Sequence, residues 1–394
     1  FALVASVAVA EVSIGAWGRG IFLPVNHNGD DSITDTAPSW GGWGGDESRI
    51  GFTMAGNSDN VGFVIDGNVD GGAFSMGDNQ YIWVKPVDML TIRMGNLYDD
   101  TLRGNAAFGS FNWYRGLGNG DGEDITFSRI GINRSREGFE LAVAPMDALY
   151  VALYFYNLDK NLTENLFSNM QFAVGYTIDG IGQIKGQVLT TAVMEKPTYA
   201  LPANPDDWTW GWIDNDDDAS TESVWGPQTV ATSSGKVDET GAKIELAFNL
   251  TMVENLFVEI GFGMETNNDV PTKMSYNGVE AEVEDYKKIA LYAKYNMAPV
   301  TIHFSSINEI AKVVDTEMKY KLIAGLDFDA GNGIGVSADV AYTGVTVSGA
   351  DPVISGFAGV TKGYSNGKIG AGLQVLNDGE DTHFGIPVVM EFWF

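Results

Sequence analysis

The chain has 394 residues, with 23 Lys and Arg against 52 Asp and Glu, a formal net charge of -29 and no cysteine. This charge argues against nucleic acid as a partner, because neutralising phosphates requires clustered basic side chains. The lack of cysteine excludes zinc–thiolate sites and thiol catalysis. A hydrophobic content of 44% is too high for a disordered chain.

Residues 1–10, FALVASVAVA, form the most apolar stretch at the start of the sequence and end in Ala8-Val9-Ala10. They are too short for a membrane-spanning helix, which needs roughly 20 apolar residues. The small-x-small ending is typical of a secretory signal peptide, so we expect a signal-peptide remnant here. An uncleaved segment that extends the first strand is the alternative.

From Glu11 onward the dominant pattern is the alternation of apolar and polar residues with period two. Residues 243–250 are one example, with Ile, Leu, Phe and Leu on one face and Lys, Glu, Ala and Asn on the other. Successive side chains of a strand point to opposite faces, so such stretches predict strands with one apolar face. The same alternation recurs in 256–263, 288–295, 300–305 and 334–341. Alternation alone fits both a soluble sandwich and a membrane barrel.

The connections between these strands favour the membrane barrel. Short turns alternate with longer polar segments, as in an up-and-down barrel with short periplasmic turns and long extracellular loops. The short turns are expected at 57–60, 86–89, 145–147, 179–182, 251–255, 296–299, 330–333 and 365–367. The longer connections are expected near 24–46, 71–78, 98–137, 157–168, 193–240, 265–285, 307–316, 344–353 and 377–381.

The predicted fold is therefore all-β: one transmembrane antiparallel β-barrel over residues 11–394. It has about 18 strands if residues 98–137 are a single inserted loop, and residues 193–240 form a long acidic surface loop. A strand at 125–133 with a partner in 105–115 would give about 20 strands, and merging weak strands would give about 16.

The last residues alternate with an apolar face and stop on an aromatic residue. This pattern resembles the C-terminal strand of Gram-negative outer-membrane β-barrels, and an ordinary buried final strand is the alternative. The resemblance implies that outer-membrane lipid and the barrel-assembly machinery are partners of this chain. The residues of this expected assembly signal are Phe384, Ile386, Val388, Met390, Phe392 and Phe394.

A second, local resemblance involves Trp83–Leu90, Gly95-Asn96 and the segment from Asp100 to Gly104. These residues resemble a hairpin of the porin-like outer-membrane proteins of spirochaetes, in which a long third loop follows. The resemblance implies a passive or weakly selective channel for small hydrophilic solutes in the outer membrane of a Gram-negative-type bacterium. By analogy with general porins, we expect a homotrimer.

The distribution of arginine suggests where a pore would be charged. All eight arginines lie between residues 19 and 136. The alternation places four basic residues on the lumen face of the first five strands, and an inward-folding loop 98–137 would set carboxylates opposite them in a constriction with a transverse field. The open alternative is that these arginines only neutralise nearby carboxylates. The expected pore-lining residues are Arg19, Arg49, Lys85, Arg93, Asp99, Asp100, Arg103, Asp121, Glu123 and Asp124.

Aromatic residues follow the same alternation. The alternation places Trp17, Tyr81 and Trp83 on the inner face of the barrel. There they would form a stacking track for sugars or pack against the inserted loop. The outward parity holds aromatic residues near the strand ends, where interface girdles are expected. These outward residues are Tyr176, Tyr295, Tyr320 and Tyr342.

Other chemistry has little support in the sequence. Asp214, Asp216 and Asp218 have the first spacing of a calcium loop, but Ala219 replaces the turn glycine and Trp225 replaces the closing glutamate. No histidine has a persuasive nucleophile or carboxylate beside it, so we expect neither an enzyme nor a cofactor.

The sequence thus predicts an outer-membrane porin for small hydrophilic solutes and ions. The first alternative is an abundant surface or adhesin-type barrel whose acidic loops bind partners. The second is a soluble secreted β-protein.

Overall fold

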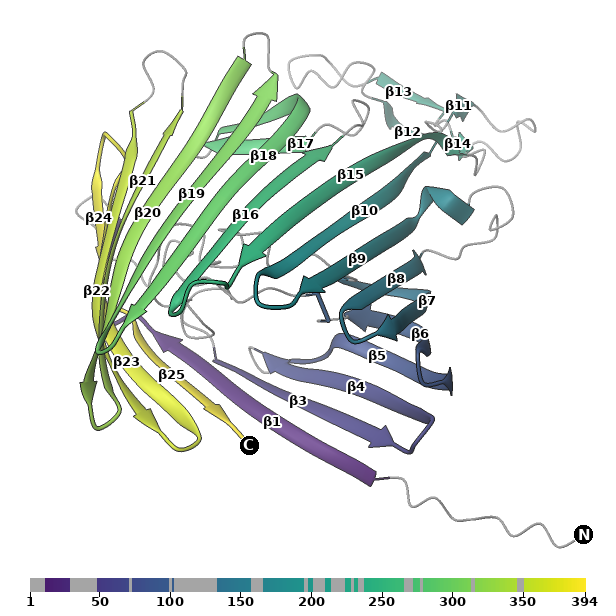
Figure 1. The fold of residues 1–394 in the computed structure, drawn as a ribbon. Coiled ribbons are helices and arrows are strands. Elements are labelled where there is room, and N and C mark those ends of the chain that lie inside the picture. The colour runs from purple at the N-terminus through teal and green to yellow at the C-terminus, as the bar shows by residue number, and fades with distance from the viewer. Residues whose placement is uncertain are drawn as a thin grey trace, which may run out of the picture.

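The computed structural model is a closed antiparallel barrel of 18 strands, as the sequence predicts (Figure 1). Of the predicted alternatives of 16, 18 and 20 strands, the structure has 18. The structure describes residues 11–28, 48–70, 73–98, 101–102, 133–156, 166–194, 198–200, 210–213, 224–227, 230–232, 237–265, 272–276, 279–312, 316–345 and 351–394.

The barrel strands pair with their neighbours in chain order. They are β1 (Glu11–Phe22), β3 (Ser48–Asn57), β4 (Val61–Asp70), β5 (Ala73–Val87), β6 (Leu90–Tyr98), β7 (Asn133–Met146), β8 (Leu149–Tyr156), β9 (Met170–Ile178), β10 (Gly182–Met194), β15 (Val237–Leu250), β16 (Leu256–Glu265), β18 (Val279–Met297), β19 (Val300–Lys312), β20 (Thr316–Gly331), β21 (Ile334–Val345), β22 (Val353–Tyr364), β23 (Gly367–Asn377) and β25 (Val388–Trp393).

The barrel closes between its first and last strands. Strand β25 pairs antiparallel with β1, with Arg19 opposite Glu391. The backbones of Ala16 and Phe394 exchange two hydrogen bonds, so the ladder continues to the last residue of the sequence. Closure removes free strand edges, which otherwise expose unpaired N–H and C=O groups.

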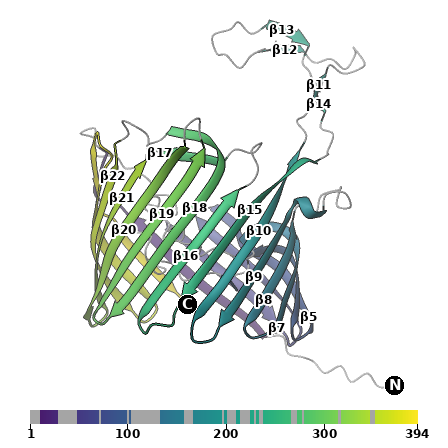
Figure 2. The same cartoon turned by 45° about the horizontal axis from the view of Figure 1, so that its top comes forward.

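Three short strands extend this sheet and four lie outside it. Strands β2 (Asn26–Asn28) and β24 (Thr382–Gly385) pair with each other, and β17 (Thr272–Tyr276) pairs with β18. The predicted acidic loop contains β11 (Thr198–Ala200), β12 (Trp210–Ile213), β13 (Val224–Pro227) and β14 (Val230–Thr232). They form two separate two-stranded sheets beyond the barrel rim (Figure 2). A 3-10 turn, η2 (Leu166–Ser168), precedes β9.

All eight predicted short turns lie where the sequence places them, at the lower end of the barrel in Figure 2. Two predicted long connections are much shorter than expected. Strand β5 begins at Ala73, and β19 and β20 are separated only by residues 313–315. Between β19 and β20, polar residues continue the strand pairing where a loop was expected. Glu309 and Lys319, for example, are cross-strand partners and form an ion pair at 3.8 Å.

Other predicted boundaries also shift. Strand β7 begins at Asn133 and β18 begins at Val279, inside the expected loops 98–137 and 265–285. The predicted last strand is divided into β24 and β25 around Pro387, which has no N–H to donate to the ladder. Phe384 consequently pairs with His27 of β2, and their rings stack at 4.9 Å.

The two faces of the barrel differ in chemistry. Large apolar side chains are exposed on the outside, as in Ile14, which is 72% exposed, and Phe74, which is 62% exposed. The opposite parity carries buried polar side chains, including Glu140, Lys185 and Gln374. An apolar exterior around a polar interior reverses the arrangement of a soluble protein and is typical of a barrel surrounded by lipid. Among the described residues, no helix is long and apolar enough to span a membrane.

Candidate functional site: the inner wall of the barrel

The predicted basic side of the lumen lies on β1, β3, β5 and β6. Arg19 and Arg49 are cross-strand partners, so their side chains leave the same face of the sheet. Arg19 Nη2 lies 2.6 Å from Glu391 Oε1 on β25, which joins the first and last strands by an ion pair. The Arg19 guanidinium also lies 5.9 Å from the Trp17 ring centroid. The seam of the barrel is thus closed by side chains as well as by its backbone ladder.

Arg93 has a carboxylate partner on the next strand. Its Nη1 lies 2.5 Å from Glu140 Oε2 on β7, and the Glu140 side chain is fully buried. Lys85 Nζ lies 5.5 Å from the Trp83 ring, so this lysine shares the inner parity with an aromatic neighbour. Among the described residues, Arg19 and Arg93 thus each have a carboxylate partner on a neighbouring strand.

A polar network continues around the wall on strands β9 to β16. Gln171 Nε2 donates to Gln187 Oε1 at 2.6 Å, and Gln187 in turn donates to Glu245. Lys243 Nζ lies 3.2 Å from Glu245 Oε1 and 3.9 Å from Glu265 Oε1. Polar and charged side chains of neighbouring strands are therefore linked into one network along the wall. Such links give buried polar groups the partners that they require.

The far wall holds an extended hydrogen-bond chain. Asp327 on β20 is its centre, because its Oδ1 accepts from Ser337 Oγ at 2.6 Å and its Oδ2 lies 2.5 Å from His303 Nε2. His303 Nδ1 lies 3.2 Å from the Tyr292 hydroxyl. Asp327 lies between Ser337 and His303. In a nucleophilic triad the histidine contacts the serine, so this order of groups differs from a triad.

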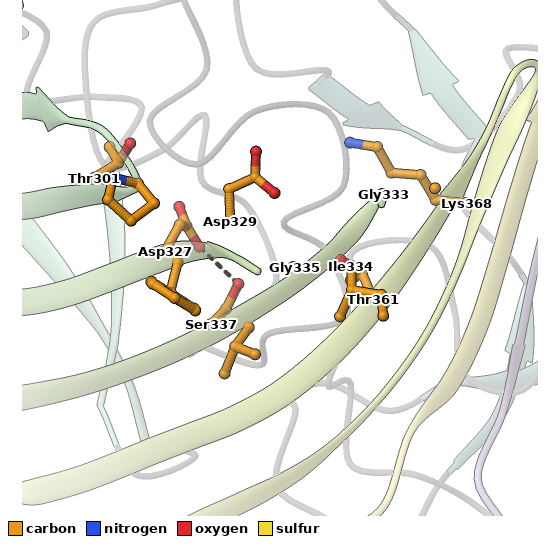
Figure 3. Close-up of a pocket in the computed structure, with 13 residues that line it drawn as sticks. Thr301, Asp327, Asp329, Gly333, Ile334, Gly335, Ser337, Thr361 and Lys368 are labelled. Carbon is orange, nitrogen blue, oxygen red and sulfur yellow. Dashed lines mark hydrogen bonds between the residues drawn. The ribbon is translucent and has the colours of Figure 1, made fainter. Parts of the chain in front are cut away.

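Beside this chain the inner wall is hollowed at the short-turn end of β19 to β23. The cavity has a volume of about 420 Å³. Figure 3 shows the side chains of Asp329 and Lys368 extending toward the same open space, with the Asp327–Ser337 hydrogen bond below it. The polar side chains that line the cavity are Thr301, Asp327, Asp329, Ser337, Thr361 and Lys368.

Part of the predicted inserted loop lies inside the barrel. Leu102 is 2% exposed and belongs to a buried cluster with Tyr154 of β8 and Ala173 of β9. A Cβ at Gly175 on the inner face of β9 would lie only 2.2 Å from Leu102 Cδ2. Leu102 thus packs an apolar side chain against the inner wall.

The structure brings together only some of the predicted site residues. Arg19, Arg49, Lys85 and Arg93 share the inner parity of neighbouring strands. The predicted loop residues Asp99, Asp100, Arg103, Asp121, Glu123 and Asp124 lie outside the described residues, as do residues 1–10 and the candidate calcium ligands Asp214, Asp216 and Asp218. Among the residues described, no three His, Asp or Glu side chains are grouped as a metal site.

Sequence reasoning missed the wall carboxylates Glu140 and Glu391 and the pair formed by His303 and Asp327. Their inward parity was visible in the alternation. Their interaction partners could not be read from the sequence. Arg19 and Glu391, for example, are 372 positions apart and meet only because β1 pairs with β25.

Comparisons with known proteins found similar solved structures but no similar sequence. No family model matches the sequence, and no curated protein matches it. Among solved structures, OmpT of Vibrio cholerae lacking loop L8 is 12% identical, with 98% of this chain and 99% of that chain covered and a TM-score of 0.49. An anion-selective porin from Comamonas acidovorans is 12% identical, with 98% and 100% covered and a TM-score of 0.46. OmpF of Salmonella typhi in complex with daunomycin is 11% identical, with 98% of each chain covered and a TM-score of 0.46.

Proposed function

We propose that this chain is an outer-membrane porin through which small hydrophilic solutes and ions diffuse passively. The observation that carries the proposal is the closed barrel with an apolar outer face and an inner wall of charged and hydrogen-bonding side chains. The apolar outer face suits contact with lipid, and the polar inner wall suits contact with water. Closure pairs the backbone N–H and C=O groups of all strands, which a bilayer could not do. The function requires no covalent step and no cofactor.

We further propose that residues 98–137 narrow the pore and form a constriction opposite Arg19, Arg49, Lys85 and Arg93. The inward position of Leu102 supports a loop that folds into the lumen. Asp99, Asp100, Arg103, Asp121, Glu123 and Asp124 would then provide the charges of the constriction. The pairs Arg19–Glu391 and Arg93–Glu140 reduce the net positive charge of the wall, which favours weak charge selectivity.

Assembly and location follow from the same proposal. The short turns would face the periplasm and the long connections the outside. The last strand, with Val388, Met390 and Phe392 on its outer face, would be the segment that the assembly machinery recognises. A homotrimer, by analogy with general porins, completes the proposal. The resemblance to spirochaete porins implies that it lies in the outer membrane of a Gram-negative-type bacterium.

A second candidate function is binding by the acidic extracellular segment. Strands β12 and β13 form a sheet of their own, with Trp212 opposite Trp225. Four short strands in a predicted loop give it a defined backbone that a partner molecule would contact. In this case the lumen would be closed to solutes and the segment 193–240 would carry the function.

Conductance across a planar lipid bilayer under a salt gradient tests the proposal. The purified full chain should insert and give discrete current steps, recurring in threes for a trimer, with a reversal potential that reports ion preference. A barrel that inserts without conducting would overturn the porin function and favour the second candidate. Deletion of residues 201–233, which removes most of the acidic segment, should leave the current steps intact.

A further inference from the structure

We propose that the cavity at the short-turn end of the inner wall binds small hydroxylated ammonium compounds of the amino-sugar class. The cavity, of about 420 Å³, exceeds the size of one such molecule and opens toward the lumen between β19 and β23. The inference deepens the proposed porin function, since the site would face the path of diffusing solutes.

The charges of the cavity select for a cation. Asp327 and Asp329 are two positions apart on β20, so both side chains leave the inner face with Cα atoms about 7 Å apart. Together with Lys368 they leave one net negative charge. An ammonium group close to both aspartates would be favoured, because hydrogen bonds between charged groups are stronger than neutral ones.

The two carboxylates are held in place before any ligand binds. Asp327 is fixed by Ser337 and His303 through its two oxygens. Asp329 Oδ1 accepts from the Gly331 backbone N–H at 2.8 Å. A site whose groups are already oriented loses less conformational entropy on binding than a flexible one.

The remaining lining suits hydroxyl groups. Thr301, Ser337 and Thr361 come from three different strands, and Lys368 reaches across the space toward Asp329 (Figure 3). Thr301 and Ser337 donate their hydroxyl hydrogens to Asn296 and Asp327, so their oxygens remain acceptors for a ligand. Glycine provides the room, since a Cβ at Gly335 would lie 2.8 Å from Thr361 Oγ1. A polyhydroxylated ring with one ammonium group therefore matches both the charge and the hydrogen-bonding capacity of the wall.

Isothermal titration calorimetry of the purified full chain in detergent, with glucosamine as the probe, tests the site. We expect glucosamine to bind at least about tenfold more tightly than glucose, which lacks the ammonium group. It should also bind more tightly than methylammonium, which lacks the hydroxyl groups. Equal affinity for glucosamine and glucose would overturn the inference.

Substitutions locate the binding. Asp329→Asn should weaken glucosamine binding about tenfold by removing one carboxylate charge, and Gly335→Val should abolish it by filling the cavity. The matched control is Glu380→Gln in the exposed turn after β23, which removes the same charge outside the cavity. Wild-type affinity in Asp329→Asn and Gly335→Val would exclude this cavity.

Folding and conduction are measured on the same preparations. Retained heat-modifiable migration on a gel would establish that each variant is folded. A barrel that conducts but has no affinity for glucosamine would overturn this inference alone. A barrel that binds glucosamine but does not conduct would overturn the porin function alone.

Discussion

Lys185 and Glu259 form an ion pair that spans three strands of the wall. Nζ of Lys185 on β10 lies 3.3 Å from Oε2 of Glu259 on β16, with β15 between them. The register explains the reach, because Lys185 faces Ala247 on β15 and Ala247 faces Gly261 on β16. These two small residues leave space for the long side chains to meet above the middle strand.

This pair should matter for stability because both side chains are almost fully buried, with 0% and 3% exposure. Glu259→Gln leaves a buried lysine without its countercharge and should reduce the free energy of unfolding by about 3 to 5 kcal/mol. The double variant Lys185→Met/Glu259→Leu should lose less, since it leaves no buried charge. Urea unfolding in detergent, followed by tryptophan fluorescence, measures both. Glu254→Gln in an exposed short turn is the control, and an equal loss there would refute the role of the pair.

Substituting either member of the Arg93–Glu140 pair should change the ion preference of the pore, and the two substitutions should act in opposite directions. Glu140→Gln removes the negative charge beside Arg93 and should shift the reversal potential toward anions. Arg93→Glu should shift it toward cations. Both shifts should be largest near 0.1 M salt, where the Debye length is about 10 Å and charges act over that distance. They should shrink at 1 M salt, where the Debye length is about 3 Å. Unchanged reversal potentials in both variants would place Arg93 outside the conduction path.

The sequence predicts the barrel well because alternation is a local property. The eight short turns and the inner parity of Arg19 and Arg93 follow from period two and from turn residues. The pairing of Arg19 with Glu391 requires the closing register, which local patterns do not contain.

The extension of the β19–β20 hairpin was missed for a related reason. Where β19 and β20 continue past the apolar belt, residues such as Asn308 and Glu309 give no apolar face, yet their backbones still pair with β20. Polar composition therefore resembles a loop in the sequence, although the hydrogen-bond ladder is unbroken. The His303–Asp327 contact depends on the same cross-strand register and was likewise hidden.

The turn after β23 should depend on pH. The backbone N–H of Asp381 donates to Asp378 Oδ1 at 2.8 Å and is the main cause that lowers the pKa of the Asp378 carboxyl below its ordinary value, with a further hydrogen bond from His383. A lowered pKa in the folded state means that the stabilisation is present above about pH 3.9 and is lost as the pH falls through the folded value. The carboxyl carbon shift of Asp378, followed by NMR, should titrate below about pH 3.9. Titration at or above that value would contradict the capping role.

The contact between Leu102 and Gly175 should hold the start of the inserted loop against the wall. Gly175→Val puts a branched side chain where the Leu102 methyl group lies, so we expect the loop to leave the wall and the single-channel conductance to change. Leu102→Ala should have the same effect and reduce the free energy of unfolding by about 2 to 5 kcal/mol, as for other buried leucines. Gly18→Val is the matched control, because a Cβ at Gly18 would have no heavy atom within 4 Å. If both Gly175→Val and Leu102→Ala conduct like the wild type, this contact does not position the part of the loop that limits current.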